Sequence, residues 1–453
     1  QGEVDICNMK QSPLWDGDFE SRLRAADVVL ITNMGVGLDS PFLERLERWL
    51  YAHHPKYWID VVEPKKTDIL YRNMDEDKRI LLESYRRTSG VMNYVRLING
   101  ALSTEPASEW EQPDPIPWQA IMGRAGNIYE TYDAFMDAEG HRDWPSIAVY
   151  FYRDEWIMGD IAYQQALFEE IFKHQYNPII FYGQYGSNPR VGIPNMKLSM
   201  NHLFGQDVFP FDVLINTCKF SFQSLGAQTL EELKLQDVPI VQGYTIYMDE
   251  KSWAENPQGV TPLDVNLSIS QPELDGVIHG GVVACQTFDE QGHYMYLPVK
   301  ERISAIVQRA IKWSKLRHIP VSERKVAIIL HNYPPKNSNI GSAAGLDTPE
   351  SVLRLLRQMQ AEGYSIDSVP ETSVDLMELV TSHMTNDRSM LTDELLASAE
   401  GRISSADYRA YFATLPDDTR VAMVKSWGEA PGDVFVYDDE VIIPGFANGN
   451  LWI

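Results

Sequence analysis

The sequence is poor in cysteine and in positive charge, and each shortage excludes a class of protein. Its three cysteines, Cys7, Cys218 and Cys285, form no CxxC pair, which excludes a zinc ribbon and argues against a disulfide framework. We interpret them as buried apolar thiols. Lysine and arginine number 39 against 64 aspartates and glutamates, for a formal net charge of −25. Because nucleic acids and anionic membrane surfaces bind basic faces, neither is expected as a partner.

Long hydrophobic runs and a nucleotide-binding loop are also missing. No window approaches the roughly 18 consecutive apolar residues of a membrane span, and no GxxxxGK[ST] loop occurs, so nucleotide hydrolysis by that route is not expected. The start, Gln1–Asp5, does not resemble a signal peptide. These features favour a cytoplasmic protein; a periplasmic or membrane-associated one stays open if a cleaved or anchored segment precedes residue 1. The strand-like run Ile442–Ile453 suggests a fragment of a longer chain.

Short apolar runs alternate with amphipathic segments along much of the chain. The run Asp27–Thr32 is typical of a buried strand, and Ser40-Pro41 offers the start of the helix that follows. Further strands are predicted at 146–152, 178–182, 211–215, 238–242 and 325–330, with helices at 230–235 and 301–316. This alternation predicts an α/β fold, with several mostly parallel-sheet units around a large cleft.

Changes in composition suggest three domains. An α/β unit without a specific motif would occupy residues 1–145, following the Pro- and acid-rich stretch at 104–117. A second α/β unit would occupy 146–320. A third, α/β to helical and truncated at its end, would occupy 321–453.

The most informative stretch is His331–Ser351, with the sequence HNYPPKNSNIGSAAGLDTPES. Polar sequence rich in Pro and Gly, between a strand and a helix start, is where α/β proteins place ligand-binding groups. His331 could serve as a base near neutral pH, and Tyr333-Pro334-Pro335 would form a stiff apolar ledge. Taken singly, each residue has an ordinary structural explanation: Asp347, for example, could simply cap the following helix.

A second candidate element is Ser270–Ile278, with the sequence SQPELDGVI. If the segment is extended, Glu273 and Asp275 share one face, an arrangement that raises the pKa of one carboxyl or binds a divalent cation. The alternative is an Asp-Gly turn with a solvated glutamate. The role of the nearby His279 is not indicated by the sequence.

Both elements resemble motifs of one family. His331–Ser351 is similar, over about twenty residues, to a motif of the cobaltochelatase large subunit and, more loosely, of the porphyrin-binding subunit of magnesium chelatase. Pro272–Gly276 resembles the family's Pro-Glu-x-Asp-Gly element, and Tyr150–Arg153 resembles a strand end upstream of it. Weaker matches extend the resemblance over roughly residues 146–453.

The resemblance implies a tetrapyrrole- and metal-binding subunit of an ATP-dependent metal chelatase. Cobalt is the expected metal substrate and magnesium the alternative, with ATP handled by separate AAA+-type ATPase subunits. His331, Glu273 and Asp275 are the implied catalytic and metal-binding residues. The implied substrate-binding residues are Arg153, Asn332, Tyr333, Pro334, Asn337, Asn339, Gly341 and Asp347.

A second interpretation needs the same residues. A tetrapyrrole- or haem-binding protein, or one that removes the metal from haem, would act without driven insertion. A nucleotide-sugar-type α/β enzyme ranks last, because no Gly-rich diphosphate-binding cluster occurs.

Overall fold

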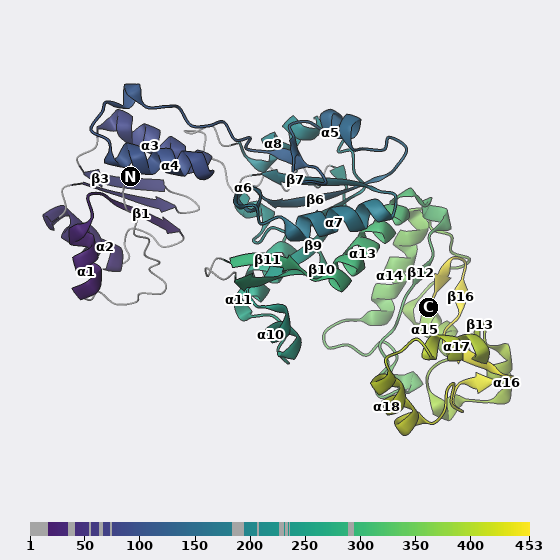
Figure 1. Cartoon of the computed structure of the whole chain (residues 1–453). Helices are drawn as coiled ribbons and strands as arrows, with labels where there is room; N and C mark the ends of the chain where they lie inside the picture. Colours follow the sequence, from purple (N-terminus) through teal and green to yellow (C-terminus); the bar gives the residue numbers. More distant parts are fainter. Residues whose placement is uncertain are drawn as a thin grey trace. The chain divides into compact units, whose positions relative to one another are not determined.

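The structure is a computed structural model that describes residues 17–34, 41–53, 56–62, 67–72, 75–183, 194–205, 208–225, 231, 234, 236–288 and 294–453. The chain divides into two compact units, Gln1–Ser314 and Lys315–Ile453 (Figure 1). The predicted division into three domains, with boundaries after residues 145 and 320, stays a prediction.

The first unit begins with a small α/β layer. Its elements are α1 (Gly17–Ala25), β1 (Val29–Met34), α2 (Pro41–His53), β2 (Tyr57–Val62) and β3 (Thr67–Arg72). β1 pairs parallel with β2, and β2 pairs antiparallel with β3. Leu46 and Leu50 of α2 are buried against Phe19 and Leu23 of α1. The strand and helix predicted from Asp27 onward are therefore confirmed, and Pro41 is the first helical residue.

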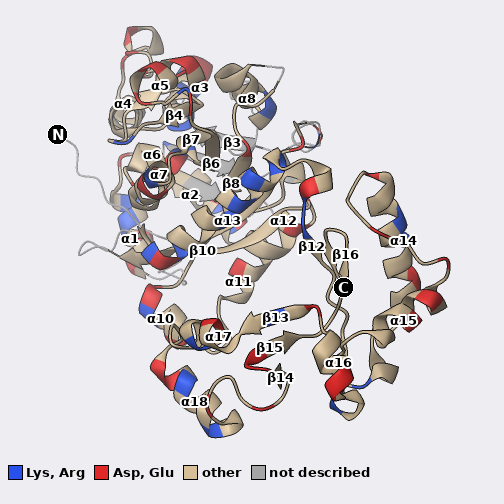
Figure 2. Cartoon of the chain, turned by 90° about the vertical axis from the view of Figure 1, so that its right-hand side faces the viewer, with Lys and Arg blue, Asp and Glu red and all other residues tan. Residues whose placement is uncertain are grey.

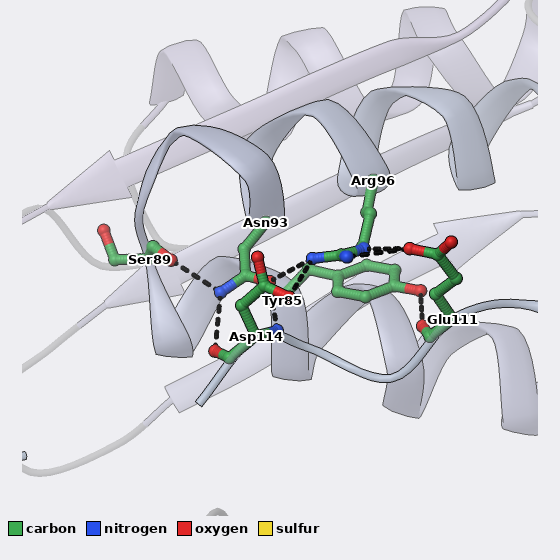
Figure 3. Close-up of polar contacts among 6 residues, drawn as sticks. All are labelled: Tyr85, Ser89, Asn93, Arg96, Glu111 and Asp114. Atoms are coloured by element: carbon green, nitrogen blue, oxygen red, sulfur yellow. Dashed lines mark hydrogen bonds and ion pairs between the residues drawn. The ribbon is translucent and has the colours of Figure 1, made fainter. Parts of the chain in front are cut away.

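Two helices, α3 (Glu76–Thr88) and α4 (Val91–Leu102), hold the Pro-rich segment that follows them. Asn93 is 1% exposed and donates to the carbonyls of Ser89 and Asp114. Arg96 forms ion pairs with Glu111 at 2.7 Å and Asp114 at 2.8 Å (Figure 3). The Tyr85 hydroxyl donates to the Glu111 carbonyl. Residues 111–114 are thus fixed to the helices by side chains.

An eight-stranded sheet forms the centre of the first unit. Its order is β11-β10-β9-β8-β6-β7-β4-β5. The bounds are β4 Ala120–Met122, β5 Ile128–Tyr129, β6 Ser146–Tyr152, β7 Asn177–Gly183, β8 Val213–Asn216, β9 Ile240–Ile246, β10 Ile278–Phe288 and β11 Tyr294–Pro298. The five strands from β10 to β7 run parallel, and the outer pairings are antiparallel. This parallel-rich sheet confirms the α/β prediction.

Chain order within the parallel part places a switch point in the middle of the sheet. Counted from β6, the five parallel strands are arranged 2-1-3-4-5. The chain therefore moves outward in one direction from β6 to β7 and in the other from β8 onward. Open α/β sheets bind ligands outside the carboxyl ends of the strands at such a point. The loops that follow β6 and β8 are thus the expected ligand-binding loops of this unit.

Helices connect the strands of this sheet, and several of them pack against its buried residues. They are α5 Tyr132–Ala138, α6 Arg153–Met158, α7 Ala162–Lys173, α8 Met196–Phe204, α10 Glu250–Glu255, α11 Pro262–Asp264, α12 Gln271–Glu273 and α13 Lys300–His318, with a π-helix at Val265–Ser270. Every residue of β7, β8 and β9 is buried, as expected for central parallel strands. The helix predicted at 301–316 is confirmed as α13. The one predicted at 230–235 lies largely outside the described residues.

The second unit combines two three-stranded sheets with several helices. Its helices are α14 Thr348–Ala361, α15 Ser373–Ser382, α16 Asp393–Ser398, α17 Ser405–Phe412 and α18 Asp417–Trp427. One sheet has the order β12-β17-β16 (Val326–Ala327, Leu451–Trp452, Ala447–Asn448), and the other β13-β15-β14 (Gly401–Ser404, Glu440–Ile443, Val436–Tyr437). Figure 2 shows acidic positions on helices of both units.

The buried strand predicted at Lys325–Leu330 is wrong in length and burial. β12 contains only Val326 and Ala327, and Ile329 is 91% exposed. β12 is the edge strand of its sheet, and alternate side chains from Val326 to Leu330 face the hydrophobic cluster around α14. The segment packs against the protein on one face only. A short apolar run is compatible with burial on one face or on both faces, so the sequence could not distinguish the two.

Two further sequence expectations concern cysteine and membranes. Cys218 and Cys285 are free and buried, as predicted, whereas Cys7 lies outside the described residues. Among the residues that the structure describes, no helix is both long and apolar enough to cross a membrane.

Candidate functional site

The His-Asn-Tyr-Pro-Pro segment forms a closed loop in the second unit. The His331 carbonyl accepts a hydrogen bond from the Gly341 amide at 2.7 Å, which joins the two ends of the loop. Gly341 has φ +78°, and a Cβ there would lie 3.3 Å from Thr348, so glycine is required for this closure. Glycine at position 341 thus has a structural explanation, and binding of substrate by Gly341 stays a prediction.

The amide side chains of the loop are used to build it. Asn339 donates to the Pro334 carbonyl at 2.9 Å. Asn332 donates to Asn386 and accepts from the Lys336 amide. Asn337 accepts from Thr385 at 2.6 Å. Binding of substrate by Asn332, Asn337 and Asn339 stays a prediction, since each already has partners within the protein.

Asp387, which sequence reasoning missed, anchors this loop. Its carboxylate is 6% exposed and accepts from the Asn337 amide at 2.9 Å and from the amide and hydroxyl of Ser389. These hydrogen bonds, those from Ser389 first, lower the pKa of Asp387 below its usual value. The only signal in the sequence is its place before an Arg-Ser pair, which by itself indicates nothing.

The loop presents a different set of side chains to solvent. His331, Tyr333 and Pro334 are exposed, Tyr333 by 75%. Asp347 is the N-cap of α14 and accepts from the Glu350 amide at 3.0 Å, which matches the ordinary helix-start explanation. The arrangement therefore offers an imidazole beside an exposed tyrosine ring and proline ledge, on a backbone fixed by buried polar contacts.

The Pro-Glu-Leu-Asp-Gly element is not extended, which corrects one expectation. Glu273 ends α12, and a turn follows in which the Gly276 amide donates to the Glu273 carbonyl. The Asp275 carboxylate accepts from the Ser221 hydroxyl at 2.7 Å and from the Phe222 amide. Pro272 at the second helical position and the Asp-Gly pair favour a helix end with a turn, so the local geometry follows the turn alternative.

Glu273 has a partner in His279, for which the sequence indicated no role. The Glu273 carboxylate lies 3.5 Å from His279 Nε2, and His279 Nδ1 lies 2.9 Å from the Tyr244 hydroxyl. Glu273 and His279 are exposed, whereas Tyr244 is 8% exposed, and burial raises the pKa of Tyr244 to about 12. The arrangement is a carboxylate–imidazole–phenol chain on the surface of the first unit, and it can hold or pass a proton.

Arg153 is buried and holds backbone. Its side chain is 1% exposed and donates to the carbonyls of Thr88, Ile116 and Pro117 at 2.8 to 3.1 Å. The guanidinium carbon lies 4.4 Å from the centre of the Trp118 ring. Burial lowers the pKa of Arg153. Binding of substrate by Arg153, which the resemblance implies, stays a prediction.

A cluster at the switch point of the sheet was missed by sequence reasoning. After β8, Thr217 donates to the Tyr150 carbonyl of β6 at 2.9 Å, and the amide of Lys219 donates to the Tyr152 hydroxyl at 2.7 Å. The buried amides of Asn216 and Gln242 fix this turn through the Cys218 carbonyl. The loops after β6 and β8 are thus joined by hydrogen bonds at the edge of the sheet where the strand order places a ligand site.

Titratable groups gather at this edge. The Glu155 carboxylate accepts from Tyr163 and Gln164 at 2.6 Å each, and burial raises its pKa to about 8. Lys219 is 5% exposed, and burial lowers its pKa to about 8 despite Asp264 at 3.9 Å. Groups with pKa values shifted toward neutrality in opposite directions are typical of functional sites. The π-helix beside them is another common feature of such sites.

The predicted site residues fall into two groups. Glu273, Asp275 and Arg153 belong to the first unit, and the His331 loop belongs to the second. A site shared by His331 and Glu273 therefore stays a prediction. Within the described ranges, no three His, Cys, Asp or Glu side chains are grouped closely enough to hold a metal ion.

Comparison with known proteins gives one family. A family model described as CobN/Magnesium Chelatase matches residues 83–453, beginning earlier than the resemblance at 146–453. An uncharacterized protein of Methanocaldococcus jannaschii is 32% identical over 404 residues, which cover 84% of this chain and 32% of that protein. The aerobic cobaltochelatase subunit CobN of Pseudomonas aeruginosa is 27% identical over 388 residues, covering 82% of this chain and 29% of that protein.

Further matches agree with these. A magnesium-chelatase subunit of Rhodobacter capsulatus is 28% identical over 239 residues, covering 49% of this chain and 19% of that protein. The solved catalytic subunit of cobaltochelatase from Mycobacterium tuberculosis has the same fold, with a TM-score of 0.58 and 22% identity, over 97% of this chain and 36% of that chain. The chain spans about a third of the length of the Methanocaldococcus and Pseudomonas relatives.

Proposed function

Because the chain belongs to the CobN/magnesium chelatase family, we propose that it is the tetrapyrrole- and metal-binding part of a metal chelatase. The observation that carries this proposal is that the family match, residues 83–453, includes both the Glu273–Asp275 element and the His331–Ser351 loop. In the proposed reaction a divalent metal ion replaces the two pyrrole N–H protons of a free-base tetrapyrrole. The metal is the substrate, Co²⁺ in the first place and Mg²⁺ as the alternative.

His331 is proposed as a base that accepts a pyrrole proton. Its imidazole is exposed and makes no hydrogen bond to the other described residues, so both ring nitrogens are open to a ligand. The exposed Tyr333 ring and Pro334 are proposed to contact the face of the macrocycle. The anchoring of the loop by Asp387 supports these roles, because a base must be held at a fixed distance from the proton that it removes.

Glu273 and Asp275 are proposed to deliver the metal ion. Oxygen and imidazole ligands bind Co²⁺ and Mg²⁺ without the tight retention of thiolates, and Glu273 lies beside the His279 ring. Of the two carboxylates, Glu273 is the more accessible, because Asp275 already accepts two hydrogen bonds from the loop at Ser221. A metal ion at Asp275 would have to compete with those donors.

ATP is proposed to act through partner subunits of the AAA+ type. The sequence has no Walker-type loop, so a driven reaction would need a separate ATPase. The chain by itself is expected to bind a free-base tetrapyrrole weakly and not to metallate it.

The test follows the absorbance of a free-base porphyrin with Co²⁺ or Mg²⁺, with and without ATP and ATPase partner subunits. For His331→Ala we expect porphyrin binding to survive and the metallation rate to fall by about 10²- to 10⁴-fold, the usual range for a lost general base. His202→Ala, at an exposed position on α8, is the control and should keep the wild-type rate.

Two outcomes would contradict the proposal. Wild-type turnover by His331→Ala would remove His331 from the mechanism. Loss of metal from a metalloporphyrin on addition of residues 1–453 alone, without ATP, would favour the demetallating or carrier protein instead.

A further inference from the structure

Lys219 has an unusual environment at the switch point of the large sheet. Its side chain is 5% exposed, and its ammonium nitrogen lies 3.2 Å from the centre of the Tyr247 ring and 5.9 Å from that of Tyr296. Within the described part of the chain, Nζ makes no hydrogen bond. An ammonium group has three donors, and leaving them without acceptors in a buried place costs free energy.

The neighbouring carboxylate does not satisfy this ammonium. Asp264 lies 3.9 Å from Nζ, beyond hydrogen-bonding distance. Its oxygens accept instead from the Thr261 hydroxyl at 2.6 Å and the Tyr247 amide at 3.3 Å. Asp264 is the last residue of the short helix α11. Both carboxylate oxygens of Asp264 are thus used by other donors. The charge of Lys219 is therefore balanced only in part, and its ammonium group has no hydrogen-bond acceptor among the residues that the structure describes.

Glu155 does not supply that acceptor either. Its carboxylate oxygen is bound by Tyr163 and Gln164. Since burial raises its pKa to about 8, the group is mostly neutral at pH 7. At neutral pH the positive charge of Lys219 is consequently not fully neutralised by its neighbours, so a ligand with a negative charge would be attracted to it, in spite of the acidic composition of the chain.

Exposed aromatic side chains lie next to Lys219 in the chain or next to the rings that are close to it. Tyr247, which covers Nζ, is 41% exposed, and Phe220, the residue after Lys219, is 36% exposed. Tyr294 is 48% exposed, and its ring lies 6.3 Å from that of Tyr296. Tyr294 pairs across the strands with Phe288, which is 65% exposed. We call Tyr247, Phe220, Tyr294 and Phe288 the aromatic rim. Such rings offer flat apolar surface for stacking.

We propose that Lys219 and the aromatic rim bind a planar ring system that carries a carboxylate, with the carboxylate accepting hydrogen bonds from Nζ and the ring lying against the rim. This inference rests on the proposed function and deepens it, because tetrapyrroles are planar and commonly carry acidic side chains. It assigns to the first unit a role in holding the macrocycle by one of its carboxylates. No residue of this site belongs to the elements at 270–278 and 331–351.

The proposal requires a particular dependence on pH. The pKa of Lys219 in the protein without ligand is about 8, and a carboxylate at Nζ would raise it. Binding of the acid then takes up a proton above pH 8. Between about pH 6 and pH 8, where the ligand carboxylate is ionised and Lys219 is protonated, affinity should be nearly constant, and above pH 8 it should fall by up to about tenfold per unit.

The experiment compares a porphyrin dicarboxylic acid with its neutral dimethyl ester, each titrated into residues 1–453 in the same dilute detergent. The wild type should prefer the acid by about 10- to 100-fold, the factor that a hydrogen bond to a charged group contributes. Lys219→Met should lose this preference and keep its affinity for the ester, and Lys219→Arg should keep part of the preference. Lys173→Met, at an exposed position on α7, is the matched control and should behave as the wild type.

The outcomes separate this inference from the function on which it rests. If the wild type and Lys219→Met bind acid and ester with the same affinities, the site is not at Lys219, although the porphyrin-binding function stands. If the wild type binds neither, both fail. Should Lys219→Met not fold, the wild type decides: an acid preference that is unchanged between pH 6 and pH 10 overturns the inference.

Discussion

Replacing Arg153 with methionine is expected to destabilise the first unit strongly, rather than to weaken ligand binding. The guanidinium donates three hydrogen bonds to the carbonyls of Thr88, Ile116 and Pro117, and it stacks on Trp118. These carbonyls belong to the end of α3 and to the segment that leads from α4 into the large sheet. Methionine replaces the apolar stem of the side chain but is shorter than arginine and offers no donor.

The magnitude follows from the number of bonds that are lost. A hydrogen bond from a charged donor contributes about 1.5 to 3 kcal/mol net, and the substitution removes three. Relief from burying a charge returns part of this, because the desolvation of a buried ion costs several kcal/mol. We therefore expect the free energy of unfolding to fall by about 3 kcal/mol, within the range of single substitutions that break a buried network.

The assay is urea-induced unfolding of residues 1–453, followed by tryptophan fluorescence, with Trp118 as a reporter beside the substituted residue. Arg142→Met serves as the control: Arg142 pairs with Asp137 on the surface, with 67% and 71% of the two side chains exposed, so its loss should cost less than about 1 kcal/mol. Arg153→Lys should recover part of the difference, since one ammonium can reach one of the three carbonyls.

A specific result would refute this reasoning. If Arg153→Met unfolds at the wild-type urea concentration but binds a carboxylated porphyrin at least tenfold more weakly, then the role of Arg153 is to bind substrate, as the family resemblance implied. A loss of stability with unchanged affinity for the porphyrin would establish the structural role.

Two other predictions concern groups that the sequence did not single out. The pKa of Glu155 is raised to about 8 from a usual value of 4.5. Between pH 4.5 and pH 8 the folded state therefore keeps a proton on Glu155 that the unfolded state has lost. The free energy of unfolding should fall as the pH rises from 5 to 8, and this dependence should be weaker in Glu155→Gln. Equal slopes in urea unfolding would contradict the raised pKa. Asp387→Ala removes the acceptor for the Asn337 amide and for Ser389, so hydrogen exchange should accelerate in residues 332–340 while α14 stays protected; unchanged exchange there would show that Asp387 does not anchor the loop.

The local sequence pattern was enough to predict those helices and strands that are determined by their own residues and by residues close to them in the chain. The apolar spacing at 301–316 predicted α13, and the Asp-Thr-Pro sequence at 347–349 predicted the start of α14. The runs at 146–152 and 178–182 predicted β6 and β7 almost to the residue, because fully buried strands need unbroken apolar sequence. The His331–Ser351 motif indicated the family, which the comparison then confirmed.

Tertiary structure alone decided how distant residues share their polar contacts. Arg153 binds carbonyls 36 to 65 positions away, and Asp387 binds an amide 50 positions away. Lys219 is buried because the loops after β8 and β9 converge on it, and this follows from the strand order. Periodicity reports which face of an element is apolar. It contains no information about which elements become neighbours, and the burial, pKa and partners of a charged side chain depend on those neighbours.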